Sequence, residues 1–178
     1  MEKTMIIIRG NPSYGKSAAI SFAYEQMIKQ MGKACTQVYS QGERRPRKRG
    51  SGPPEVWGLI LRIDDVLVGF ASPGDTPEHL DRCLKPLILR KCLVIVGATR
   101  LAPNHPTWER AWELASDNHF EVVPFYKTAL QADVHTADWQ AACDQANQDW
   151  AAKEIVPEIW KAIAKAKLPA EPIVATRN

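Results

Sequence analysis

The chain has 178 residues, of which 45% are hydrophobic and 24% are charged, and its formal net charge is +3. This composition is typical of one globular domain with a core of its own, and the charge is too small to indicate nucleic-acid binding by itself. No apolar stretch approaches the roughly 20 residues of a transmembrane helix, so we expect no membrane contact. We expect a single domain over residues 1–166, followed by a flexible tail over residues 167–178.

The first predicted elements are a strand, a glycine-rich loop and a helix. Residues 5–8 are a short apolar run rich in β-branched side chains, which predicts a buried strand. Residues 16–31 carry apolar side chains at helical spacing, and Gly32 stands where that helix should end. The octapeptide between the two elements matches the pattern G-x-x-x-x-G-K-[ST] at every fixed position, as Gly10, Asn11, Pro12, Ser13, Tyr14, Gly15, Lys16 and Ser17.

This octapeptide, at the junction of a strand and a helix, resembles the Walker A loop of the P-loop NTPase superfamily. Gly10 and Gly15 permit a close approach that a Cβ would block, so that backbone N–H groups can surround an anion beside the positive end of the helix. The resemblance implies that Lys16 reaches the β- and γ-phosphates and that the Ser17 hydroxyl takes one coordination site on Mg²⁺. We therefore expect residues 10–17 to bind a nucleoside triphosphate together with Mg²⁺.

The next segment is strongly basic. Residues 41–55 read QGERRPRKRGSGPPE, with three prolines and three glycines, which predicts a mobile loop rather than a regular element. The cations could bind an anionic partner, either nucleic acid or a phosphorylated ligand, or they could simply be solvated. No base-stacking array of aromatic residues accompanies them, which weakens a sequence-reading role. The five cations are Arg44, Arg45, Arg47, Lys48 and Arg49.

Strands and helices alternate through the remainder of the chain. Residues 57–71 predict a β-hairpin that turns at Asp64 and Asp65, because short polar residues tolerate positive φ. The apolar run at 92–97 is typical of the centre of a sheet covered on both faces. The other predicted elements are strands at 35–39 and 120–125, helices that begin near residues 77 and 106, and C-terminal helices within 128–166 that Pro157 separates.

This alternation predicts an α/β fold with a mostly parallel sheet and one antiparallel hairpin strand. The resemblance of the loop implies the three-layer sandwich of the P-loop NTPases. The hairpin after the first helix resembles the Ras-like branch, in which the returning strand feeds a turn that senses the γ-phosphate. Parallel sheets bind ligands at the carboxyl ends of their strands, so the loops at that edge are expected to complete the site.

Two side chains near the ends of predicted strands are candidates for the rest of the site. A P-loop usually needs a carboxylate there to hold Mg²⁺ through water. Asp75 follows the strand at 66–71 and lies at the phosphate end if that strand is parallel to the first, whereas Asp64 and Asp65 would lie at the opposite end. We favour Asp75, although it could simply cap the next helix. Arg100 could stabilise charge on a γ-phosphoryl group, or could bond to carbonyls or solvent at a loop edge.

These residues together predict a Mg²⁺-dependent P-loop nucleoside triphosphatase, with Lys16, Asp75 and Arg100 in catalysis and with Ser17 and Asp75 at the metal. No N-K-x-D guanine motif follows the strand at 92–97, where the chain reads GATR, so ATP is expected rather than GTP. Three alternatives stay open: a small-molecule or nucleotide kinase, a nucleotide-dependent switch or assembly subunit with slow turnover, and an ATPase stimulated by nucleic acid.

The remaining chemistry-bearing residues indicate location more than activity. The four cysteines form no C-x-x-C pair, which favours reduced thiols, and the four histidines show no metal-ligand spacing. A cleaved signal peptide would remove the phosphate loop, so a cytoplasmic protein is expected. The six tryptophans are expected to dock helices, or to form a protein interface such as that of a homo-oligomer.

Overall fold

The computed structural model describes residues 1–12, 14–41, 57–72, 74–102, 104–128 and 137–167. The predicted basic loop lies outside these residues except for Gln41, and so do Ser13 and the predicted tail beyond Lys167. The strands are β1 (Lys3–Arg9), β2 (Cys35–Ser40), β3 (Trp57–Ile63), β4 (Val66–Ala71), β5 (Val94–Thr99) and β6 (Phe120–Tyr126). The helices are α1 (Lys16–Met31), α2 (Pro77–Leu89), α3 (Pro106–Asp117), α4 (Ala137–Trp150) and α5 (Val156–Lys167), with a 3₁₀ turn at Gly32–Ala34 and a π-helical turn at Ala151–Ile155.

One sheet contains the six strands of the described chain, in the order β2-β3-β4-β5-β1-β6. β1 pairs in parallel with β5 on one side and with β6 on the other, and β5 pairs in parallel with β4. β3 runs antiparallel to both of its neighbours, β2 and β4. The predicted α/β fold with a mostly parallel sheet and one antiparallel hairpin strand is therefore confirmed. The hairpin turns where predicted, with a positive φ of 51° at Asp64.

The carboxyl ends of β4, β5 and β1 lie at the same edge of the sheet. In register, Ala71 of β4 pairs with Gly97 of β5, which pairs in turn with Ile7 of β1. The turn after β4 is therefore at the glycine-loop end of the sheet, as the sequence predicts. β5 nevertheless lies between β4 and β1, so a side chain that follows β4 must reach across the end of β5 to approach the loop.

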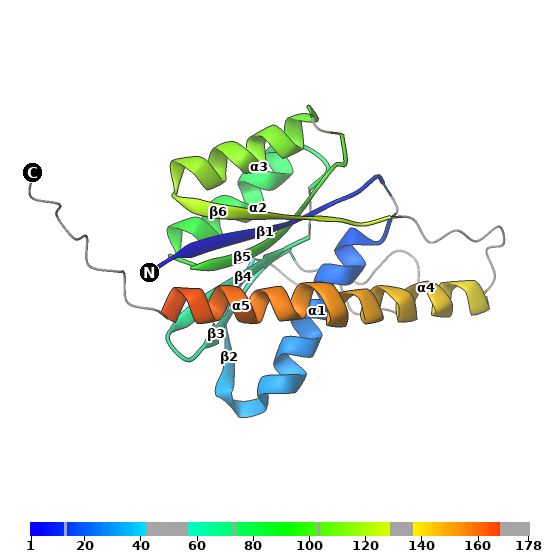
Figure 1. Cartoon of the computed structure of the whole chain (residues 1–178), viewed down its shortest axis with the longest axis horizontal. Coiled ribbons are helices and arrows are strands. Elements are labelled where there is room, and N and C mark those ends of the chain that lie inside the picture. Colours follow the sequence, from blue (N-terminus) through cyan, green and yellow to red (C-terminus); the bar gives the residue numbers. More distant parts are fainter. Residues whose placement is uncertain (13, 42–56, 73, 103, 129–136, 168–178) are drawn as a thin grey trace, which may run out of the picture.

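Helices cover both faces of the sheet (Figure 1). Because side chains alternate along a strand, β1 directs Ile6 and Ile8 into the core with α1 and α5, and Met5 and Ile7 into the core with α2 and α3. All four side chains are fully buried, and burial of a side chain of this size contributes about 1.5–3 kcal/mol. Packing on both faces thus fixes the end of β1, where the glycine loop begins.

Two boundaries differ from the sequence prediction. β5 begins two residues later than predicted. The Cys92 N–H donates to a carbonyl of α2, and the Leu93 N–H donates to the carbonyl of the second residue of β4. Pro157 does not separate the C-terminal helices, since α4 continues through the π-helical turn into α5 and Pro157 lies in the first turn of α5. A proline ring clashes with the carbonyl four residues earlier in a regular helix, and the wider π turn directly precedes it here. Residues 137–167 therefore form one continuous helix.

The four cysteines are free. Burial raises the pKa of Cys83 to about 11 and that of Cys92 to about 12, so both remain protonated thiols at neutral pH. Among the helices of the described chain, none combines the length and the apolar character that crossing a bilayer requires.

Candidate functional site

The glycine loop leaves β1 at Gly10 and enters α1 at Lys16. Gly15 is the N-cap of α1 and has left-handed dihedrals, with φ 76° and ψ 19°. A Cβ on Gly10 would lie 3.0 Å from the Lys127 carbonyl oxygen, and one on Gly15 would lie 2.5 Å from Asn147 Oδ1. Gly15 is therefore favoured chiefly by its positive φ, whereas a Cβ on Gly10 would require the Lys127 carbonyl to move by a few tenths of an ångström.

The other loop residues are more open to solvent. Asn11 and Pro12 are exposed, and Tyr14 is half-buried. The Tyr14 hydroxyl accepts a hydrogen bond from Asn11 Nδ2 at 3.3 Å, and the backbone N–H of Tyr14 donates to the Asn11 carbonyl at 3.4 Å. At the base of the loop, the Gly10 N–H donates to the Thr99 carbonyl at 3.3 Å, which joins the loop to the end of β5.

Lys16 is folded back over the loop. Its ammonium group donates to the carbonyls of Gly10 and Asn11, each at 2.8 Å, and the residue is only 7% exposed. Burial, followed by the positive charge of Arg100, lowers the pKa of Lys16 to about 8, while the negative charge of Asp75 opposes this shift. Lys16 therefore lies within electrostatic reach of both downstream candidates.

Asp75 and Arg100 form an ion pair, with 2.9 Å between Oδ1 and Nη2. The Asp75 side chain is 63% exposed, whereas that of Arg100 is 20% exposed and its Nη1 atom is buried without a hydrogen-bond partner. Gly74 makes this approach possible, because a Cβ there would lie 1.8 Å from the Ala98 carbonyl oxygen. The helix cap of α2 is Thr76, whose side chain accepts a hydrogen bond from the His79 N–H, so Asp75 does not serve as that cap.

Ser17 faces the same edge of the sheet. Its hydroxyl lies 3.5 Å from the Ser72 carbonyl oxygen, directly after β4. Ser17 and Asp75 both carry oxygen atoms at this edge of the sheet, and Mg²⁺ prefers oxygen ligands while keeping several waters and phosphate oxygens of its own. The chemistry of these oxygen donors suits Mg²⁺, and a metal site at Ser17 and Asp75 stays a prediction. In the described part of the chain, no group of three or more His, Cys, Asp or Glu residues is arranged to hold a metal ion.

The structure adds a group of residues that sequence reasoning missed. Arg9, directly before the loop, is 5% exposed and lies with its guanidinium 4.0 Å from the centre of the Trp108 ring. It donates to the Leu101 carbonyl at 2.7 Å and to the Tyr126 hydroxyl at 3.2 Å. The segment after β5 is thereby attached to β1 and β6. The position of Arg9 next to the loop was the available signal, but its aromatic partners are distant in sequence.

Thr107 and His105 hold the backbone of Arg100. The Arg100 N–H donates to Thr107 Oγ1 at 3.1 Å, and that hydroxyl lies 2.9 Å from His105 Nδ1. His105 also caps α3 by accepting the Thr107 N–H. Arg100 is therefore oriented from both ends, by Thr107 at its backbone and by Asp75 at its guanidinium.

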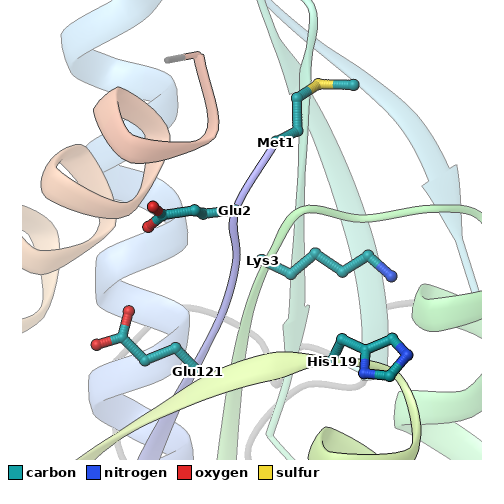
Figure 2. A pocket seen from close by; sticks show the side chains of 5 residues that line it. All are labelled: Met1, Glu2, Lys3, His119 and Glu121. Carbon is teal, nitrogen blue, oxygen red and sulfur yellow. The ribbon is translucent and has the colours of Figure 1, made fainter. Parts of the chain in front are cut away.

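A shallow hollow of about 320 Å³ lies at the opposite end of the sheet, near the amino ends of β1 and β6 (Figure 2). Glu2 and Glu121 point to one side of the chain there, and Lys3 and His119 point to the other. The Lys3 ammonium already donates to the Asn118 carbonyl at 3.0 Å. None of the predicted site residues borders this hollow, so it is separate from the glycine loop.

Comparison of the chain with protein-family models, with curated proteins and with solved structures gives no match. The functional argument therefore depends on the geometry of the glycine loop and of the residues around it.

Proposed function

We propose that the chain is a Mg²⁺-dependent nucleoside triphosphatase that binds ATP at the glycine loop and has the P-loop NTPase sandwich fold. The observation that carries this proposal is the ion pair of Asp75 with Arg100 at the same edge of the sheet as the glycine loop and Lys16. The three residues come from α1, from the turn after β4 and from the end of β5. Their association beside a left-handed glycine at a helix N-terminus suits a phosphate site better than a structural turn.

The loop supplies the binding groups for the phosphates. Its N–H groups and the positive end of α1 favour an anion, and the Lys16 ammonium adds a full positive charge. Burial of Lys16 is costly while no anion is present, which the lowered pKa reflects. Phosphate oxygens would stabilise the protonated amine and draw it from its backbone acceptors toward the ligand.

Arg100 and Asp75 supply groups at the γ-phosphoryl end. Nη2 of Arg100 is engaged by Asp75, whereas Nη1 is buried and has no acceptor, so a phosphoryl oxygen would provide one. Donors placed in advance where charge develops are the main catalytic device in phosphoryl transfer. Asp75 is exposed enough to hold a water for attack on the γ-phosphorus, and Ser17 and Asp75 would hold Mg²⁺. When bound, the metal ion neutralises charge on the phosphate oxygens.

The decisive experiment is calorimetric titration of the wild-type protein and of Lys16→Ala with MgATP and MgGTP. Lys16→Ala should bind at least about tenfold more weakly, since a charge-assisted hydrogen bond contributes about 1.5–3 kcal/mol. Lys33→Ala is the matched control, because Lys33 is exposed in the turn after α1. Unchanged affinity for both nucleotides in Lys16→Ala, or no binding by the wild type, would contradict the proposal.

Product analysis separates hydrolysis from phosphoryl transfer. Release of free phosphate without an acceptor supports the triphosphatase, whereas ADP formation that requires an added acceptor indicates a kinase. Slow turnover with partner binding that differs between ATP and ADP would indicate a switch or assembly subunit. Stimulation by RNA or DNA that is lost when residues 44–49 are deleted would indicate an anionic partner at the basic segment.

A further inference from the structure

The C-terminal helix lies against the glycine loop, on the side away from Asp75 and Arg100. Cys143, Asn147 and Trp150 are spaced four and three residues apart, so they lie on one face of α4. α4 crosses α1 and packs against it (Figure 1), and β6 borders β1 on the side opposite to β5. The ion pair of Asp75 and Arg100 therefore lies on the β5 side of the loop. The face of α4 that carries Asn147 contacts the loop at Gly15.

Asn147 is the residue of this face that touches the loop. It is 5% exposed, and its Oδ1 atom is buried with no hydrogen-bond partner. A Cβ on Gly15 would lie 2.5 Å from Oδ1 and 2.8 Å from Nδ2, so the whole amide lies against Gly15. An amide carries both a donor and an acceptor, and a half rotation exchanges them. Since buried polar groups are nearly always paired, this amide lacks a partner that a ligand could provide.

Lys127 is a second polar residue beside the loop. It is 5% exposed, its N–H donates to the Arg9 carbonyl at 2.8 Å, and its ammonium lies 4.5 Å from the centre of the Trp150 ring. Burial lowers its pKa, and the Cys143 thiol acts weakly in the opposite direction. Among the carboxylates of the described chain, none forms an ion pair with it. A buried cation without a counter-charge is costly, and a bound anion would lower that cost.

Gly10 brings the two lysines together. The space beside its Cα is bordered by the Lys127 carbonyl oxygen, 3.0 Å from a built Cβ, and by the Lys16 side chain, 3.3 Å from it at Cδ. Lys127 thus approaches the loop with its backbone carbonyl and Asn147 approaches it with its side-chain amide, while the Lys127 ammonium lies over the Trp150 ring of the same α4 face. A bound anion would supply a counter-charge for the Lys127 ammonium, and it would accept from Asn147 Nδ2 once a half rotation of the amide turns the donor toward the ligand.

We propose that Lys127 and Asn147 form a second wall of the glycine-loop site and bind the phosphate chain of the ligand. The inference rests on the proposed function, since it assumes that the loop binds a polyphosphate. It adds that the C-terminal helix takes part in binding, and that the ligand class includes inorganic tripolyphosphate as well as nucleoside triphosphates. The contact is with phosphate oxygens, so the base and ribose do not contribute to it.

The test is calorimetric titration of the full chain with inorganic tripolyphosphate and with ATP. Asn147→Asp keeps the size of the side chain, removes the amide donor and adds a negative charge; Lys127→Met keeps most of the length and removes the positive charge. Each should weaken both ligands by a similar factor of about ten or more. Gln148→Glu and Lys153→Met are the matched controls, because both residues are exposed on the same continuous helix, and their affinities should stay within about twofold of the wild type.

Lys127→Arg should retain most of the binding, since it restores the positive charge, and Asn147→Ser replaces Asn147→Asp if the latter does not fold by circular dichroism. Wild-type affinity in Asn147→Asp and Lys127→Met, with binding still lost in Lys16→Ala, would overturn this inference and leave the proposed function intact. Weakened binding of ATP without weakened binding of tripolyphosphate would also overturn it, because the contact would then be with the nucleoside. If the wild type binds neither ligand, the proposed function fails and this inference fails with it.

Discussion

Substituting alanine for Gly74 is expected to remove most of the activity while the fold survives. Gly74 lies in the turn between β4 and α2, and its close approach to β5 brings Asp75 to Arg100. A Cβ on Gly74 would lie 1.8 Å from the Ala98 carbonyl oxygen and 2.4 Å from the carbonyl carbon. Non-bonded carbon–oxygen contacts are normally about 3.3 Å or longer, so the turn would have to move away from β5 by roughly 1.5 Å.

This displacement acts differently on stability and on catalysis. Overpacking of this kind costs about 1–3 kcal/mol, and loss of a partly exposed ion pair adds about 0–1 kcal/mol. Misplacement of a positioned group by about 1 Å lowers a catalytic rate by about 100-fold. We therefore expect the Tm of Gly74→Ala to fall by about 2–16 °C, and its rate of phosphate release from MgATP to fall by about 100-fold.

The assay combines phosphate release at saturating MgATP with thermal unfolding by circular dichroism. Gly32→Ala is the matched control, because Gly32 has a positive φ of 51° but has open space around its Cα, at the opposite end of α1 from the loop. That control should lose stability while each folded molecule keeps its wild-type rate. Wild-type turnover in Gly74→Ala would refute the reasoning, since the turn would then not position Asp75 for the reaction.

Three further predictions concern the positive charges of the site. Nucleotide affinity should fall as pH rises through about 8, because the protonated Lys16 amine binds phosphate and its pKa in the free protein is about 8. Titrations at several pH values test this, and Lys16→Arg should flatten the dependence of affinity on pH. Arg100→Met should lower kcat by about 10²–10³-fold with little change in KM in steady-state kinetics, and a change confined to KM would assign Arg100 to ground-state binding. Arg9→Met should lower the free energy of unfolding by about 2–4 kcal/mol, because the bonds to Leu101 and Tyr126 and the contact with Trp108 are lost; denaturant unfolding measures this, and a loss below about 1 kcal/mol would contradict the structural role.

The part of the site that the sequence predicts well is encoded in contiguous residues. Helix α1 has the predicted bounds because Gly15 and Gly32, both with positive φ, mark its two ends. The position of Asp75 at the glycine-loop end of the sheet was also predictable, since it required only that β4 run in the same direction as β1. The position of β5 between β4 and β1 could not be predicted, because the sequence signals for hairpins and helices do not specify which strands become neighbours in the sheet.

The residues that sequence analysis missed have partners far away in the chain. Helical spacing places Trp108 on a buried face of α3 but does not indicate that an arginine of β1 stacks on its ring. Asn147 is a polar residue within a polar helix, and only the docking of α4 brings its amide to Gly15. Pro157 misled the prediction for a different reason, since a π-helical turn accommodates the proline without ending the helix.

The continuous helix over residues 137–167 has a consequence for the order in which the protein is assembled. The glycine loop directly follows β1 in chain order, whereas α4, the helix that covers the loop, comes only after β6. The hydrogen bond between Gln26 and the Gln148 carbonyl joins positions 122 residues apart, and contacts of such separation close late in folding. A nascent chain that ends before α4 would therefore expose an uncovered loop and the apolar surface beside α1. The glycine loop, whose own residues are contiguous, is therefore enclosed only when the distant helix α4 docks on it.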